Sequence, residues 1–326
     1  PKTEERKALD AAMDALLAQQ DDVDKVLSGL LRPLVDQDLA VVFYDMTTIR
    51  TAGLSEQEGD VRQYGMSKEG VIARQVMLGV VQTADGLPLY HEIFEGNTAE
   101  VSTLKPIIEK IVERYPVKRI IAVADRGLLS IDNLQDLQAM KLPNGNPLEF
   151  ILAVPGRRYS EFVELLEPLQ AQCANAEQEV LGETPWNDLR LVMAHDPEAA
   201  AEASAKRDAL IQKLEDQAGA WVGKLDDQDG GKRARGRKLS DGGVRARFYH
   251  EVCEAHLSRI VRVDLKSELF TYTIDEKALA HARLMDGKLL LVTNTPDLAP
   301  AEVIRRYKSL ADIERGFRVL KSEIEI

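Results

Sequence analysis

The chain has 326 residues, of which 44% are hydrophobic and 29% are charged, and its formal net charge at pH 7 is -12. This length and composition predict a globular protein with one large core and a second domain or a large insertion. No apolar run approaches the roughly 20 residues that cross a bilayer, so no membrane partner is expected. The acidic balance argues against a surface devoted to nucleic acid.

Cysteine and histidine give no sign of a zinc site or a disulfide framework. Cys173 and Cys253 lack metal-ligand spacing, and the five histidines form no H-x-x-x-H or H-x-x-H pair. This cysteine usage predicts a reducing, cytoplasmic location. The start of the chain is polar and unlike a signal peptide. The missing initiator Met and the abrupt end predict a fragment of a longer protein.

The first half of the chain predicts an α/β core. Residues 5–38 have helical periodicity and predict one or two amphipathic helices that pack against the core. Next come three strands, a helix, a strand, a helix and a fifth strand, an order that predicts a mixed sheet with strands one and four as neighbours. Their expected ranges are 39–50, 71–82, 87–96, 102–115, 117–125, 130–140 and 148–155, with Ser130 as the N-cap of the second helix.

The second half of the chain departs from this order of strands and helices and then returns to it. Residues 157–285 mix a possible strand at 189–195, a long Ala-rich helix from Pro197 to Leu225 and a basic, Gly-rich stretch at 230–247. The basic stretch is predicted to be a loop, either simply solvated or in contact with phosphate. We therefore expect an N-terminal helical segment, a first core part, an inserted subdomain and a last core part, at 1–38, 39–156, 157–285 and 286–326.

The end of the chain predicts one long amphipathic helix with a carboxylate beside its apolar stripe. The stripe consists of Val303, Tyr307, Leu310, Ile313, Phe317, Leu320 and Ile324. Glu314 lies at its edge, with Arg318 and Lys321 one and two turns further on.

Two more carboxylates stand where buried strands end. Asp45 follows the apolar run of the first strand and Asp125 closes the fourth. If these strands are neighbours and the last helix crosses them, Asp45, Asp125 and Glu314 form a set of hard oxygen donors suited to Mg²⁺ or Mn²⁺. Two such ions can clamp the attacking and leaving oxygens of a phosphodiester, with cationic side chains beside them for phosphate.

Each carboxylate also has an ordinary structural interpretation. Asp45 suits a turn or a capping position, and Asp125 suits an Asx-turn into Gly127. Glu314 and Arg318 have the spacing of an i,i+4 ion pair on a helix. The order of the three along the chain, rather than any one of them, indicates a catalytic site.

Three motifs resemble those of bacterial DDE transposases of insertion-sequence family four, and are most similar to the branch named for insertion sequence sixteen-thirty-four. They are "FYDMTT" around Asp45, "VADRGLLS" around Asp125, and Tyr307-x2-Leu310-x3-Glu314-x6-Lys321. The family has arginine where this chain has Leu310, which leaves that charge to Arg315 or Arg318. The resemblance covers Leu39 to the end of the chain, with uncertain alignment in the insertion.

The resemblance implies a ribonuclease-H-like mixed sheet flanked by helices, with an inserted subdomain before the last catalytic helix. It implies that Asp45, Asp125 and Glu314 hold two Mg²⁺ or Mn²⁺ ions and that the enzyme cleaves and joins DNA at transposon ends. Tyr307, Arg318, Lys321 and Arg126 would contact DNA phosphates. The implied partners are the double-stranded DNA of transposon ends and target, and a second subunit in the synaptic complex of the full-length protein. The implied location is the bacterial cytoplasm, at the nucleoid when the enzyme is active.

Two other functions are consistent with parts of the pattern. A degenerate or domesticated transposase core would bind DNA without cutting it. A haloacid-dehalogenase-like phosphatase would use "YDMTT" as its nucleophile loop, but that chemistry needs a second Asp where this chain has Thr47.

Overall fold

The computed structural model of the chain gives the placement of most of the sequence. It describes residues 2–35, 40–51, 59–66, 72–115, 117–125, 131–173, 176–231 and 238–323. Contacts within the chain divide it into two compact units. The first consists of 1–160, 182–193 and 290–326, and the second of 161–181 and 194–289. None of the described helices has the length and apolarity needed to cross a membrane.

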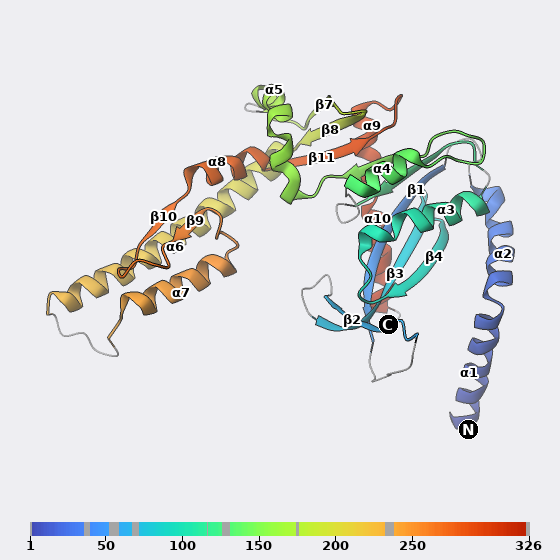
Figure 1. Ribbon diagram of the computed structural model, residues 1–326, viewed down its shortest axis with the longest axis horizontal. Coiled ribbons are helices and arrows are strands. Elements are labelled where there is room, and N and C mark those ends of the chain that lie inside the picture. The colour runs from blue at the N-terminus through green and yellow to red at the C-terminus, as the bar shows by residue number, and fades with distance from the viewer. Residues whose placement is uncertain are drawn as a thin grey trace. The chain divides into compact units, whose positions relative to one another are not determined.

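A mixed sheet forms the centre of the first unit. Its nine described strands run in the order β2-β3-β1-β5-β6-β11-β8-β7, and β4 also pairs with β3. The bounds are β1 Ala40–Arg50, β2 Gln63–Met66, β3 Ile72–Thr83, β4 Pro88–Glu95, β5 Ile120–Ala124, β6 Glu149–Ala153, β7 Val180–Trp186, β8 Leu189–His195 and β11 Lys288–Thr293. Figure 1 shows β1, β3 and β4 side by side, with α3 beside them.

The pairing of the first strands follows from their hydrophobic patterns. β1 is antiparallel to β3 and parallel to β5, and β5 is in turn parallel to β6. Every residue of β5 and β6 is buried, as expected for parallel strands covered on both faces. The predicted neighbourhood of strands one and four is confirmed. The arrangement is compatible with a ribonuclease-H-like fold.

Helices flank this sheet. α3 (Leu104–Arg114) buries Leu104, Ile107, Ile108 and Ile111, which recur at helical spacing, and packs against β4. α4 (Ile131–Ala139) packs against α3 and β6. α9 (Pro300–Lys308) packs against β5 and β6, and α10 (Ala311–Glu323) against β1. The predicted N-cap Ser130 lies outside the described residues.

The N-terminal helices differ from the expectation. α1 (Lys2–Ala18) is exposed at every residue from Glu4 onward, so it does not pack against the core as predicted. α2 (Gln20–Leu31) continues into a short 3-10 helix, Arg32–Leu34, and is fixed to α3 by an Asp24–Arg114 ion pair at 2.9 Å. The N-terminal region therefore contacts the core through α2 and not through α1.

The second unit has its own hydrophobic core. Long helix α6 (Pro197–Asp229) contributes to it, as do α7 (Asp241–Glu254), the hairpin strands β9 (Val261–Val263) and β10 (Tyr272–Ile274), and α8 (Glu276–Met285). The unit also contains α5 (Val163–Cys173), and a 3-10 helix at Gly156–Phe162 precedes it. Phe248 is fully buried, with its ring centroid 4.8 Å from that of Tyr272 and 5.3 Å from that of Phe270.

Two sequence expectations for this region need correction. The strand predicted at 189–195 is β8, which belongs to the large sheet beside β11. The basic stretch 230–247 is not a loop throughout, because α7 begins at Asp241 with Ser240 as its N-cap, whose hydroxyl accepts a hydrogen bond from Gly243 N. Part of the remainder, 232–237, lies outside the described residues.

Candidate catalytic site

Asp45 lies on β1 near the middle of the sheet. Its side chain is only 6% exposed, although β1 is otherwise apolar at this point. The Oδ1 atom accepts a hydrogen bond from Met46 N at 2.7 Å. A buried carboxylate in a central strand is costly unless its environment compensates the charge, so its position calls for a functional or structural partner.

Asp125 lies directly after β5, the parallel neighbour of β1. In the register of these two strands Tyr44 is opposite Ala124, so Asp45 and Asp125 are the next residues along both strands. Asp125 is one residue beyond the last pair of this register, at the carboxyl end of β5. The Asp125 carboxylate accepts a hydrogen bond from the Tyr307 hydroxyl, with 2.6 Å between Oη and Oδ1.

Glu314 and Asp45 line one hollow. Glu314 is in the first turn of α10 and is exposed, and α10 packs against β1. The hollow has a volume of about 260 Å³. Its lining residues are Asp45, Met46 and Thr47 from β1, and Glu314, Phe317, Arg318 and Lys321 from α10. Two predicted carboxylates and two predicted cations thus line one hollow. Asp125 is not among these lining residues and lies at the end of the neighbouring strand, β5.

The last segment forms two helices instead of the single helix predicted. α9 ends at Lys308. The backbone hydrogen bonds that follow span three residues instead of four, from Leu310 N to Tyr307 O and from Ile313 N to Leu310 O. Ser309 contributes to the break, because its hydroxyl donates to Arg305 O one turn back, a contact that often bends helices. The apolar stripe survives the break, since Val303, Leu310, Ile313 and Phe317 are all buried.

The break places Leu310 in the core. Its side chain is 4% exposed, so at this position the chain has a packing residue and not a phosphate contact. Arg318 lines the hollow instead, on the same helix as Glu314. Arg126, also predicted to contact phosphate, lies outside the described residues.

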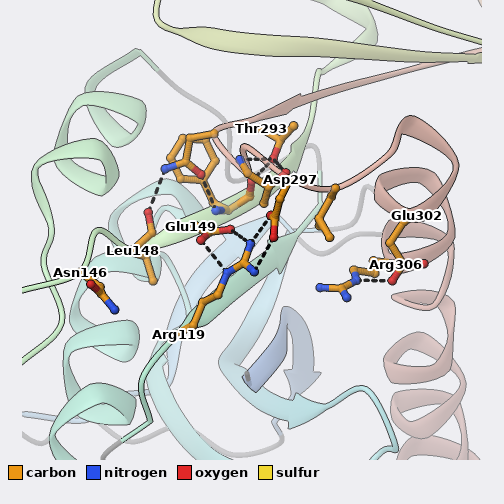
Figure 2. Close-up of polar contacts among 12 residues, drawn as sticks. Arg119, Asn146, Leu148, Glu149, Thr293, Asp297, Glu302 and Arg306 are labelled. Carbon is orange, nitrogen blue, oxygen red and sulfur yellow. Dashed lines mark hydrogen bonds and ion pairs between the residues drawn. The ribbon is translucent and has the colours of Figure 1, made fainter. Parts of the chain in front are cut away.

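A polar network holds the connection between β11 and α9, and it was not predicted from the sequence. Figure 2 shows Arg119 bonded to both Glu149 and Asp297. The Arg119 guanidinium lowers the pKa of Asp297, and the hydrogen bonds to Glu149 and then Asp297 raise the pKa of Arg119. Because Arg119 and Asp297 are far apart in sequence, only the folded sheet brings them together.

Bonds between side chains and backbone also join this connection to β6 and β8. The Asn294 side chain accepts from Phe150 N at 2.8 Å and donates to Leu148 O at 2.9 Å. Arg190 donates to the carbonyl oxygens of Thr295 and Leu298. These bonds fix the segment that leads into α9, and through it they position Tyr307 and α10.

The first turn of α9 is held by a second ionic cluster. Arg305 and Arg306 both donate to the Glu302 carboxylate, at 2.7 and 2.6 Å. Figure 2 shows the Arg306–Glu302 pair on this helix. The hydrogen bonds from Arg305 and then from Arg306 lower the pKa of Glu302 to about 2.

A buried hydroxyl pair lies behind Asp45. The Tyr44 hydroxyl donates to Thr103 Oγ1 at 2.7 Å, and burial raises the pKa of Tyr44. Gly79 on β3 leaves room for this ring, since a Cβ there would lie 3.0 Å from the Tyr44 hydroxyl. Tyr44 is therefore a structural residue that fixes β1 next to the candidate site.

The three carboxylates have the hard oxygen donors that a divalent cation prefers. Two of them, Asp45 and Glu314, also lie at the same hollow. The third, Asp125, is engaged by Tyr307. Within the described part of the chain, no three His, Cys, Asp or Glu side chains are gathered closely enough to hold a metal ion.

Comparison with known proteins adds little to this geometry. No protein-family model matches the chain, and no curated protein matches it. Among solved structures, it is similar to the piggyBac transposase in a synaptic complex with hairpin DNA, with 13% sequence identity and a TM-score of 0.30. That match covers 47% of this chain, and the chain spans only 30% of the transposase.

Proposed function

We propose that this chain is the catalytic core of a DNA transposase, which cleaves phosphodiester bonds at transposon ends and joins the ends to target DNA. The observation that supports this most is the shared hollow, where Asp45 from β1 and Glu314 from α10 lie with Arg318 and Lys321. Carboxylates combined with cations at one site suit a reaction that handles both a metal and a phosphate.

Each residue has a separate role in this proposal. Asp45, Asp125 and Glu314 hold two Mg²⁺ or Mn²⁺ ions. When bound, such ions activate the attacking oxygen and stabilise the leaving oxygen. Arg318 and Lys321 bind the non-bridging oxygens of the DNA phosphate, because both line the hollow beside the carboxylates. Tyr307 orients Asp125 through its hydroxyl.

The reaction consists of two displacements at phosphorus. In the first, a water oxygen attacks the phosphorus at the transposon end, the bond from phosphorus to the 3′ oxygen breaks, and that oxygen leaves as a free 3′-hydroxyl. In the second, this hydroxyl oxygen attacks a target phosphodiester and displaces the target's own 3′ oxygen. One bond forms and one breaks in each step, and Arg318 and Lys321 offset the charge that develops on the phosphate.

The finer identity proposed is the one that the motifs imply. The chain would be a bacterial transposase of insertion-sequence family four, with an N-terminal helical segment at 1–38 and core parts at 39–156 and 286–326. The inserted subdomain would lie within 157–285, from which β7 and β8 join the core sheet. Its partners would be the DNA of transposon ends and target and a second subunit, and it would act at the nucleoid in the cytoplasm.

Nicking of supercoiled plasmid DNA in the presence of Mg²⁺ or Mn²⁺ tests this proposal. We expect Glu314→Gln to lower the nicking rate at least about 100-fold, or about 2.7 kcal/mol in barrier height. Asp312→Asn is the matched control, because Asp312 is on the same helix but pairs with Arg315 at 3.2 Å. Nicking that survives Glu314→Gln, or that needs no divalent cation, would contradict the proposal.

A non-catalytic DNA-binding protein is the second candidate. It is favoured by the Tyr307–Asp125 hydrogen bond, which engages one of the three carboxylates. A wild-type chain that shifts a DNA duplex in a gel but never nicks plasmid would support this second function over the first.

A further inference from the structure

The N-terminal helices have an apolar stripe with a strict heptad repeat. Successive members are alternately four and three residues apart, a spacing that gives the seam of a coiled coil. The members are Leu9, Met13, Leu16, Gln20, Val23, Leu27, Leu30 and Leu34. Gln20 is the polar exception within this repeat.

The stripe is turned away from the chain's own core. Apart from Gln20 and half-buried Val23, its residues each expose between 48% and 68% of their surface. Leu17 and Val26 widen it and are exposed to a similar degree. Exposed apolar patches of this size on a protein surface usually mark an interaction site.

The inner side of α2 explains why the stripe cannot turn inward. Asp24 forms an ion pair with Arg114 of α3, and Arg32 donates to Arg114 O at 2.9 Å. Ser28, one turn beyond Asp24, is buried on the same side. These contacts hold one face of α2 against α3, which leaves the leucine face outward.

The stripe crosses the junction between the two helices. At the junction Gln19 has a non-helical backbone, with φ -114° and ψ 19°. Its N–H donates to Leu16 O at 3.2 Å and its carbonyl accepts from Val23 N at 3.0 Å, so a one-residue turn separates the two helices. Figure 1 draws α1 and α2 as successive helices running nearly end to end. At 1.5 Å per residue, residues 9–31 present a seam about 34 Å long, and Leu34 follows in the 3-10 helix.

We propose that this seam is a dimer interface, occupied by the same seam of a second copy of this chain in parallel orientation. In a parallel pair Gln20 meets its own counterpart, and the two amides can bond to each other. In an antiparallel pair aligned over 9–34, Gln20 would face Val23 and lose that partner. A single polar residue at such a position is a known device for fixing register and partner.

The exposed apolar area suits a dimer. Fully burying one large aliphatic side chain removes on the order of 60–120 Å² of apolar surface from water. The exposed members therefore supply several hundred Å² for each copy, a large part of the roughly 800 Å² that each partner of a stable complex buries. Two-fold symmetry makes one such surface sufficient, because it is its own complement. The dimer interface does not depend on the chemistry of the candidate site.

Sedimentation velocity of the full chain tests the interface. We expect the wild-type chain to sediment as a species of twice 36.3 kDa. The double variant Leu16→Glu, Leu27→Glu should sediment at 36.3 kDa, because forming the dimer would bury the new carboxylates in the seam. Ala18→Glu adds one carboxylate to the exposed opposite side of α1 and should remain a dimer. Circular dichroism checks that all three chains are folded.

Disulfide trapping gives a second readout that does not depend on a destabilising charge. In a parallel dimer Leu30→Cys faces its own counterpart, so mild oxidation should yield a covalent dimer, whereas Ala18→Cys should not. The wild-type chain, with Cys173 and Cys253, gives the background. A wild-type monomer, a charge-insensitive dimer or an absence of trapping at residue 30 would each overturn the proposal.

Discussion

Tyr307 and Asp125 show how a single contact affects the interpretation of the site. Their hydrogen bond joins two residues that are 182 positions apart, and both belong to motifs that the sequence places in one catalytic centre. A hydroxyl that donates to a carboxylate occupies one lone pair and fixes the orientation of the group. For Asp125 this means that Tyr307 engages Oδ1 and fixes the orientation of the carboxylate.

Glu302 gives a pH prediction at the same scale. Its pKa in the folded chain, about 2, is below its ordinary value of 4.5, so the folded state favours the ionised form. The associated stability is present above pH 4.5 and is lost as the pH falls towards 2. Glu302→Gln should therefore lower the free energy of unfolding at pH 7 by about 1 kcal/mol, the upper range for such pairs.

Urea unfolding of the wild-type chain and the Glu302→Gln variant, at pH 7 and again at pH 3, measures this effect. The difference between the two proteins should narrow at the lower pH, because at pH 3 the Glu302 carboxylate is protonated in the unfolded chain but still ionised in the folded one. Glu109→Gln on α3 is a control, since Glu109 is exposed. A difference that stays constant with pH would contradict the assigned cause.

At the scale of single residues, the sequence named several residues that the structure brings together, but not the residues that support them. Asp45, Glu314, Arg318 and Lys321 were identified and share one hollow. Arg119 and Asn294 were not identified, because their partners are far away in the sequence. Asn294 bonds to Phe150, 144 positions away, and Arg119 bonds to Asp297, 178 positions away. Neither residue stands in a local pattern that would have revealed its role.

At the scale of elements, hydrophobic periodicity predicted the strands and helices that lie in the centre of the sheet. β1, β3, β4, β5 and β6 all fall within or close to their expected ranges, because each carries a long apolar run or an alternating pattern. The short strands β2, β7 and β9 were missed, since their residues are only partly buried and give a weak signal.

Two elements show how a local signal can mislead. The apolar stripe on the last segment predicts one helix. The helix is nevertheless interrupted at Ser309, and the stripe residues on both sides of the interruption remain buried. Similarly, Gly and basic residues near 241–247 predict a loop, whereas the cap at Ser240 and the burial of Val244 and Phe248 produce α7. Tertiary burial overrides weak helix propensity in this segment.

At the scale of the whole molecule, the chain has two hydrophobic cores, and each can be followed separately. Its two tryptophans lie in different units, Trp186 in the first and Trp221 in the second. Trp221 packs on the second core, with its ring centroid 6.4 Å from that of Phe248. In a Trp186→Phe background, fluorescence therefore reports on the second unit alone.

Phe248→Ala should destabilise that unit by about 3–5 kcal/mol, since it removes a fully buried ring and leaves a cavity. Urea unfolding followed by Trp221 fluorescence measures the shift. Tyr249→Ala is the matched control, because Tyr249 is the next residue and is 43% exposed. Equal effects of both substitutions would contradict the assignment of Phe248 to the core.

Binding of Mn²⁺, followed by the loss of the free-ion signal in electron paramagnetic resonance, is the sharpest test of the proposed catalytic site. We predict that the wild-type chain binds Mn²⁺ and that Asp45→Asn weakens binding at least about tenfold, as expected for loss of a metal ligand. Asp312→Asn, outside the hollow, should bind as the wild type does. Unchanged Mn²⁺ affinity in Asp45→Asn would contradict the assignment of this hollow as a metal-dependent catalytic site.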